Sequence, residues 1–132
     1  MQHAKRCALI VDDDPINVEI LTDYLSSTGF TILTAYDGRQ ALELLQQQAN
    51  HIDVVLLDRM MPHVDGLTVL KEIRNQPALQ HLLVIMQTAK ARPQEIEEGQ
   101  QAGADYYLTK PFEEDDLLAI LDKLLPGGVR FE

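Results

Sequence analysis

Polar side chains of three kinds follow short apolar runs at four points along the chain. They are the carboxylates of Asp12, Asp13 and Asp58, the hydroxyl of Thr88 and the ammonium of Lys110. Carboxylates that lie together repel one another, which raises their pKa values unless a cation neutralises them. Mg²⁺, a hard ion that prefers oxygen ligands, suits such a group and keeps coordination positions free for phosphate oxygens. With a nearby ammonium, the set predicts phosphoryl transfer, in which a carboxylate can itself be the nucleophile.

The elements that must bring these residues together are five predicted strands. Continuous apolar runs are typical of strands buried on both faces. Such runs cover Cys7–Val11, Val54–Leu57 and Leu82–Met86, and the other two strands are predicted over Thr31–Ala35 and Tyr106–Leu108. Helical patterns separate them, and this alternation predicts a parallel α/β sheet wrapped by helices on both sides. Because the carboxyl ends of parallel strands share one edge of the sheet, the polar residues are expected to meet there.

Five helices are predicted between and after these strands. Asp14 is a suitable N-cap for the first helix, with Pro15 in its first turn. Its apolar residues recur at helical spacing: Ile16, Ile20, Tyr24 and Leu25. The later helices are indicated by Asp37-Gly38, by Leu67, Leu70 and Ile73, by Gln94–Ala102, and by the acids that follow Glu113. Gly29 is expected to end the first helix, and Pro126-Gly127-Gly128 the last.

Composition and charge exclude several classes of protein. The net charge is −10 over 132 residues, and without a basic cluster this acidity argues against direct binding of nucleic acid. No apolar run approaches the roughly 20 residues of a membrane helix. The acids directly after Cys7–Val11 do not fit a secretory signal, so the sequence indicates a cytoplasmic protein. The single cysteine, Cys7, is expected to be a small core residue.

Four segments resemble, in order and spacing, the signature of receiver domains from bacterial-type response regulators. These segments are Val11-Asp12-Asp13-Asp14-Pro15, Leu57-Asp58-Arg59-Met60-Met61-Pro62 with Asp65-Gly66, Thr88-Ala89, and Lys110-Pro111-Phe112. The resemblance covers roughly residues 7 to 125. It implies a three-layer, flavodoxin-like, doubly wound fold similar to chemotaxis regulators. Its five-stranded parallel sheet would have the order 2-1-3-4-5, with five helices.

The same resemblance implies roles for individual residues at the metal. Asp58 matches the phosphoacceptor. Asp13 matches the acid that ligates Mg²⁺ directly, and Asp12 the acid that acts mainly through bound water. The backbone carbonyl of Met60 matches the third protein ligand.

A second set of roles concerns the phosphoryl group and the switch. Thr88 and the Ala89 amide would bind the phosphoryl group, and Lys110 would pair with it. The bond between Lys110 and Pro111 is expected to be cis. Tyr107 matches the aromatic switch residue, which moves together with Thr88. The face formed by Gln94–Ala102, Tyr106–Leu108 and Glu113–Leu125 would then change, and a partner would recognise it.

The implied function is a phosphorylation switch of two-component signal transduction rather than an enzyme acting on other molecules. A histidine kinase or histidine phosphotransfer protein would supply the phosphoryl group. The output would be a separate effector or a domain beyond Glu132, and pairing with a second copy is possible by analogy. Residues 1–6 are interpreted as an extension, 7–125 as the receiver domain, and 126–132 as a tail or the start of a linker.

Two other functions compete with this interpretation. A hydrolase with an aspartate nucleophile commonly needs a second acid two residues later, where this chain has Met60. A degenerate receiver that binds partners without phosphorylation would be favoured by loss of Asp58, Thr88 or Lys110, and all three are present. Two positions depart from the usual pattern: Arg59 replaces a residue that is often apolar, and Gln87 one that is usually small or apolar.

Overall fold

The computed structural model describes residues 6–61, 64–89 and 92–129. The strands are β1 (Cys7–Val11), β2 (Thr31–Ala35), β3 (Val54–Asp58), β4 (Leu83–Thr88) and β5 (Tyr106–Thr109). The α-helices are α1 (Pro15–Leu25), α2 (Gly38–Gln48), α3 (Gly66–Asn75), α4 (Pro93–Ala102) and α5 (Glu114–Leu124), and a short 3₁₀ helix covers Ser26–Thr28. Every predicted strand and helix is therefore present.

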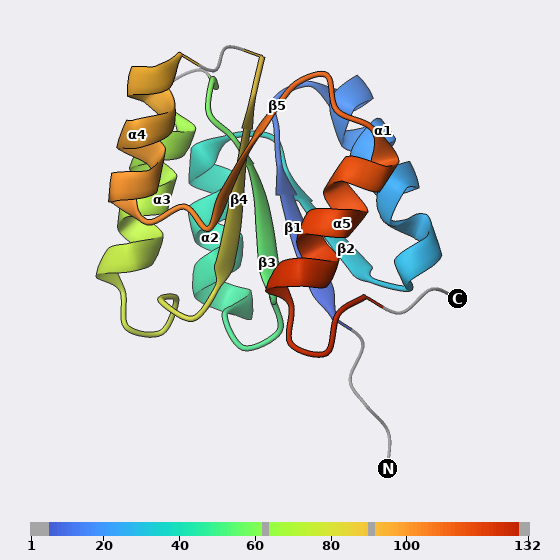
Figure 1. Cartoon of the computed structure of the whole chain (residues 1–132). Helices are drawn as coiled ribbons and strands as arrows, with labels where there is room; N and C mark the ends of the chain where they lie inside the picture. Colours follow the sequence, from blue (N-terminus) through green and yellow to red (C-terminus); the bar gives the residue numbers. More distant parts are fainter. Residues whose placement is uncertain (1–5, 62–63, 90–91, 130–132) are drawn as a thin grey trace.

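The strands form one parallel sheet in the order β2-β1-β3-β4-β5, which confirms the expected topology. Helices α1 and α5 cover one face, and α2, α3 and α4 cover the other (Figure 1). The strand order changes direction between β1 and β3, the position at which open α/β sheets form their ligand crevice. The polar residues discussed below lie at or just after the carboxyl ends of the strands around this point.

Two apolar cores lie on the two faces of the sheet. Alternate residues of β1 contribute to each: Leu9 packs towards α2 and α3, and Ile10 towards α1 and α5. All five residues of β1 and all five of β3 are buried. This explains why these runs lack a polar–apolar alternation, since a central parallel strand is covered on both sides. Cys7 is buried in β1, as expected.

Helix α1 buries a different side from the one suggested by its first apolar residues. Ile16 and Ile20 are 69% and 41% exposed, whereas the buried residues are Val18, Leu21 and Leu25. Two apolar stripes run along this helix, both at helical spacing, and only packing against the sheet selects between them. The α-helix also ends at Leu25, before the 3₁₀ turn that precedes Gly29.

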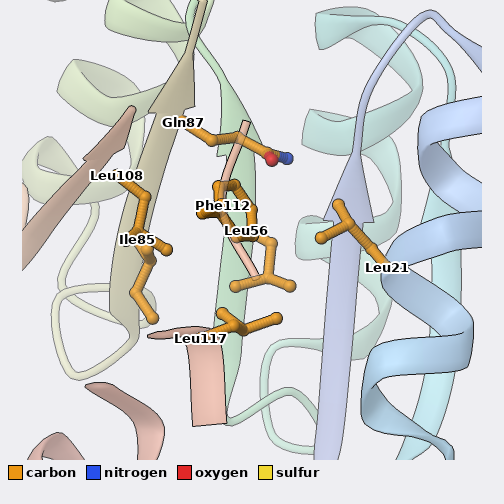
Figure 2. Close-up of a pocket in the computed structure, with 7 residues that line it drawn as sticks. All are labelled: Leu21, Leu56, Ile85, Gln87, Leu108, Phe112 and Leu117. Atoms are coloured by element: carbon orange, nitrogen blue, oxygen red, sulfur yellow. The ribbon is translucent and has the colours of Figure 1, made fainter. Parts of the chain in front are cut away.

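Gln87 occupies an apolar pocket on the α1/α5 side of β4. Its side chain points in among six apolar residues, which are Leu21, Leu56, Ile85, Leu108, Phe112 and Leu117 (Figure 2). Gln87 is 2% exposed, and neither its amide nitrogen nor its amide oxygen has a hydrogen-bond partner among the described residues. The pocket has no room for a water molecule. An unsatisfied buried amide costs free energy because it has lost its hydrogen bonds to water.

Replacing Gln87 with Met should therefore stabilise the fold. Methionine keeps a similar length and removes both unsatisfied polar atoms, so the free energy of unfolding is expected to rise by about 1–2 kcal/mol. Urea unfolding followed by circular dichroism measures this change. The control is Gln47→Met on the exposed side of α2, which should be nearly neutral. A loss of stability in Gln87→Met alone would mean that the amide is hydrogen-bonded in solution.

Candidate functional site

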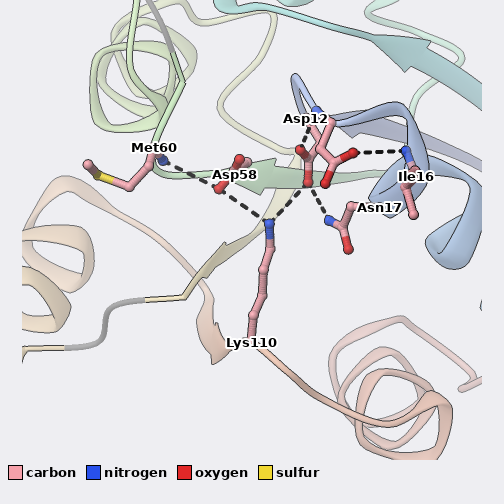
Figure 3. Close-up of polar contacts among 7 residues, drawn as sticks. Asp12, Ile16, Asn17, Asp58, Met60 and Lys110 are labelled. Atoms are coloured by element: carbon pink, nitrogen blue, oxygen red, sulfur yellow. Dashed lines mark hydrogen bonds and ion pairs between the residues drawn. The ribbon is translucent and has the colours of Figure 1, made fainter.

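The predicted polar residues meet at the carboxyl edge of the sheet. Asp58 is the last residue of β3 and Thr88 the last residue of β4, while Asp12 and Lys110 directly follow β1 and β5. Figure 3 shows the side chains of Asp12, Asp58 and Lys110 pointing towards one another. The convergence expected from the strand ends is therefore observed.

Three carboxylates form the acidic part of this site. Asp12, Asp13 and Asp58 each offer an oxygen, and these oxygens lie within 4.8 Å of one another. Asp12 and Asp58 are buried, whereas Asp13 is exposed. Such oxygen donors are the ligands that a hard divalent cation prefers. The donor set therefore fits Mg²⁺, and the exposed Asp13 leaves one side open to solvent.

Lys110 supplies the compensating positive charge. Its Nζ lies 3.2 Å from Asp12 Oδ2 and 3.6 Å from Asp58 Oδ1. Its backbone N–H donates to the Thr88 carbonyl at 2.7 Å, which fixes the start of the loop after β5. The bond between Lys110 and Pro111 is cis, as expected. One ammonium thus contacts two of the three carboxylates, and the site retains an excess of negative charge.

The carboxylate of Asp12 accepts more hydrogen bonds than those of Asp13 and Asp58. Its Oδ1 accepts a hydrogen bond from the backbone of Asp14 at 2.9 Å. Its Oδ2 accepts from the Asn17 side chain as well as from Lys110. Asp14 itself caps α1 by accepting from the Ile16 N–H at 3.0 Å, which confirms its interpretation as a capping residue. Asn17 was not among the residues predicted for the site, although its place in the first turn after three acids could have suggested it.

The surroundings of Asp58 raise its pKa from 3.8 to about 6. Burial is the largest cause, because it disfavours the charged form. Lys110 lowers the pKa, the negative charges of Asp12 and Asp13 raise it, and the hydrogen bond from the Met60 N–H lowers it. A neutral carboxylic acid is a poor nucleophile. Below this pKa a cation that replaces the proton would convert Asp58 to its reactive, charged form, and above it the carboxylate is already charged.

The loop after β3 keeps the backbone of Asp58 in place. A Cβ atom at Gly66 would lie 2.3 Å from the Asp58 carbonyl oxygen, so only glycine allows α3 to start this close to the site. Asp65 caps α3 by accepting from the Thr68 N–H at 3.0 Å. Met60, two residues after Asp58, is 58% exposed.

The remaining predicted residues lie along β4 and β5. Thr88 is fully buried and pairs in register with Thr109, and Ala89 is exposed just beyond the strand end. Tyr107 is part-buried, and its ring packs so closely on α4 that a Cβ atom at Gly99 would lie 2.8 Å from Cε2. Burial raises the pKa of Tyr107, and the guanidinium of Arg59 opposes this effect.

The chain is similar to known receiver domains over most of its length. A family model described as "Response regulator receiver domain" matches residues 8–122. The transcriptional regulatory protein CpxR of Klebsiella pneumoniae is 40% identical over 117 residues, which is 89% of this chain and 48% of that protein. The response regulator MprA of Mycolicibacterium vanbaalenii is 41% identical over 89% of this chain and 49% of its own length. The chain thus spans about half the length of these curated relatives.

Solved structures agree with the sequence comparisons. The chemotaxis protein CheY4 of Vibrio cholerae has a TM-score of 0.85 and 32% identity, covering 92% of this chain and 100% of that one. CheY from a CheX-CheY-BeF3-Mg+2 complex of Borrelia burgdorferi also has a TM-score of 0.85 and 32% identity, over 90% and 88% of the two chains. In the part of this chain that the structure describes, no helix is both long enough and apolar enough to cross a membrane.

Proposed function

Because this chain belongs to the receiver domain family of response regulators in two-component systems, we propose that it is a magnesium-dependent switch phosphorylated on Asp58. The observation that supports this most strongly is the meeting of three carboxylates and one ammonium at a single sheet edge. An excess of carboxylates suits a divalent cation, and an anion bound there would find both the cation and Lys110.

In the proposed reaction Asp58 is the nucleophile. One carboxylate oxygen attacks the phosphorus of a phosphohistidine, the P–N bond breaks, and an aspartyl phosphate forms. Asp58, Asp13 and the Met60 carbonyl would hold Mg²⁺ directly, and Asp12 would act through water. When bound, the ion neutralises charge on the phosphoryl oxygens. The domain would catalyse only its own phosphorylation and dephosphorylation, and would not act on other substrates.

Residues on the far side of the phosphoryl group would bind and report it. Lys110 would exchange its contact with Asp58 for an ion pair with the phosphoryl oxygens. Thr88 and the Ala89 N–H would donate hydrogen bonds to the same group. Tyr107 would move with Thr88, and the surface of α4, β5 and α5 would change.

The partners follow from this reaction class and from the length of the relatives. A sensor histidine kinase or a histidine phosphotransfer protein in the cytoplasm would donate the phosphoryl group. An effector or an output domain would respond to it, and two copies of the chain could pair. The net charge of −10 argues that this domain does not bind nucleic acid itself.

Intact-mass spectrometry after incubation with acetyl phosphate tests the proposal. With Mg²⁺ the protein should gain the mass of one phosphoryl group, and with a chelator it should gain none. The added group should be lost at alkaline pH, because an acyl phosphate hydrolyses readily. A folded protein that gains no mass with Mg²⁺ would overturn the proposal and favour a receiver that binds its partners without phosphorylation.

A further inference from the structure

Arg59 is a buried cation next to the proposed phosphoacceptor. Its side chain is 10% exposed. Its Nη1 donates to the backbone carbonyl of Glu95 at 2.9 Å, and its Nη2 lies 3.3 Å from Glu98 Oε1. Both partners belong to α4, more than 35 residues further along the chain. The guanidinium therefore joins the loop that follows Asp58 to helix α4.

The loop end of this link is fixed by the backbone. The Arg59 N–H donates to the Gln87 carbonyl on β4, and the Arg59 carbonyl accepts from the Gly66 N–H on α3, both at 2.9 Å. Because the Arg59 backbone is anchored at both of these points, its guanidinium has little freedom to follow a movement of α4. If α4 shifts, the contacts with Glu95 and Glu98 must lengthen or break.

Helix α4 depends on such contacts because its apolar anchoring is poor. Gly99 is its only buried residue among those that the structure describes. Its N-cap, Arg92, makes no side-chain capping bond, whereas Asp14, Asp37 and Asp65 cap α1, α2 and α3. At its other end, Arg74 Nε donates to the Gly103 carbonyl at 2.9 Å. Arg59 thus adds polar contacts to a helix that has a single buried residue among those described.

Tyr107 lies against the same link. Its ring packs on Gly99, and its buried hydroxyl has no hydrogen-bond partner among the described residues. The Arg59 guanidinium lies beside this hydroxyl, near enough to lower its pKa, although without the geometry of a hydrogen bond. The side chains of Arg59 and Tyr107 therefore both pack against the middle of α4. A large movement of any one of the three would displace the other two.

We infer that Arg59 is a positioning residue that sets the resting place of α4 and Tyr107 and thereby opposes the switch. This inference rests on the proposed function, since it concerns the balance between the two forms of the domain. Arg59 acts through α4 rather than on the phosphoryl group, because its side chain is directed to Glu95 and Glu98. Loss of the link should favour the phosphorylated form.

The test compares Arg59→Met with Glu98→Gln, which weakens the same link from its exposed end. We expect α4 amide protons of unphosphorylated Arg59→Met to exchange about ten times faster than in the wild type. The apparent affinity for beryllofluoride, a mimic of the aspartyl phosphate, should rise several-fold with Mg²⁺ present. Glu98→Gln should change both quantities in the same direction by less. Arg39→Met, which removes an exposed ion pair with Glu43 on α2, should change neither.

The two readouts separate this inference from the proposed function. Amide exchange in α4 needs no phosphorylation, so unchanged exchange in Arg59→Met would overturn the link even if the switch works. Faster exchange with unchanged beryllofluoride affinity would make Arg59 merely structural and would also overturn the inference. Failure of the wild type to bind beryllofluoride would instead reject the proposed function. If Arg59→Met does not fold, Glu98→Gln and Arg59→Lys, which cannot make the same forked contact, carry the test.

Discussion

The variant Asp58→Asn is expected to accept no phosphoryl group from acetyl phosphate and, in the absence of Mg²⁺, to be more stable than the wild type. The amide cannot form an acyl phosphate, so phosphorylation should fall to background. The gain in stability has a separate cause, because a charged carboxylate no longer has to be buried beside Asp12 and Asp13. One substitution thus removes the proposed function and relieves the electrostatic strain that the function requires.

The pH dependence of wild-type stability shows why Asp58→Asn should be stabilising. The pKa of Asp58 is raised in the folded protein from 3.8 to about 6, so between these values the folded state binds more protons than the unfolded state. The free energy of unfolding of the wild type should therefore fall as the pH rises through this window, and should level off above it. A pKa shift of this size lowers the free energy of unfolding by on the order of 2–3 kcal/mol at neutral pH.

Urea unfolding at pH 5 and pH 7.5 with a chelator measures the stability gain of Asp58→Asn and the pH dependence of wild-type stability. Asp58→Asn should lose the part of the pH slope that comes from this carboxyl, and should gain most at the higher pH. The matched control is Asp37→Asn, since asparagine caps α2 as well as aspartate does and the same charge is removed. Equal stability of Asp58→Asn and wild type at pH 7.5 would show that the carboxylate is not strained.

The variant Lys110→Met should lose both stability and phosphorylation. Its ammonium forms an ion pair with the fully buried Asp12 and also contacts Asp58. Removing one partner of a buried ion pair leaves the other charge uncompensated, which we expect to cost about 2–4 kcal/mol without Mg²⁺. The pKa of Asp58 should rise further, because Lys110 now lowers it.

Thermal or urea unfolding with and without Mg²⁺ separates the two losses. The divalent cation should restore much of the stability of Lys110→Met, since it supplies the missing positive charge. It should not restore phosphorylation, because the phosphoryl oxygens would still lack their ion-pair partner. Lys71→Met on the exposed side of α3 serves as the control and should match the wild type. Normal phosphorylation of Lys110→Met would contradict the assigned role of the ammonium.

Much of the fold could be predicted because the buried strands are so uniformly apolar. The runs at β1 and β3 have no polar residue before their terminal acids. The apolar run therefore predicted a buried strand, and the acid marked both the end of the strand and the site. Strand β4 was harder to bound. Gln87 and Thr88 belong to it, but their polarity suggested that the strand ended at Met86.

Features that depend on long-range packing could not be predicted. The buried side of α1 depends on how the helix is rotated on the sheet, and Ile16 with Ile20 formed as plausible a stripe as Val18 with Leu21. The sequence marked Arg59 and Gln87 as unusual but gave no position for either side chain. Arg59 finds its partners on α4, and Gln87 meets apolar residues from several elements, contacts that exist only in the folded chain.

The most direct test of the central proposal is an amide NMR titration of the wild-type protein with beryllofluoride, with and without Mg²⁺. The proposal predicts Mg²⁺-dependent shifts at Asp58, Thr88 and Tyr107 that spread into α4, and no such shifts in Asp58→Asn. A folded wild-type protein whose spectrum does not respond to beryllofluoride with Mg²⁺ would contradict a phosphorylation switch at this site.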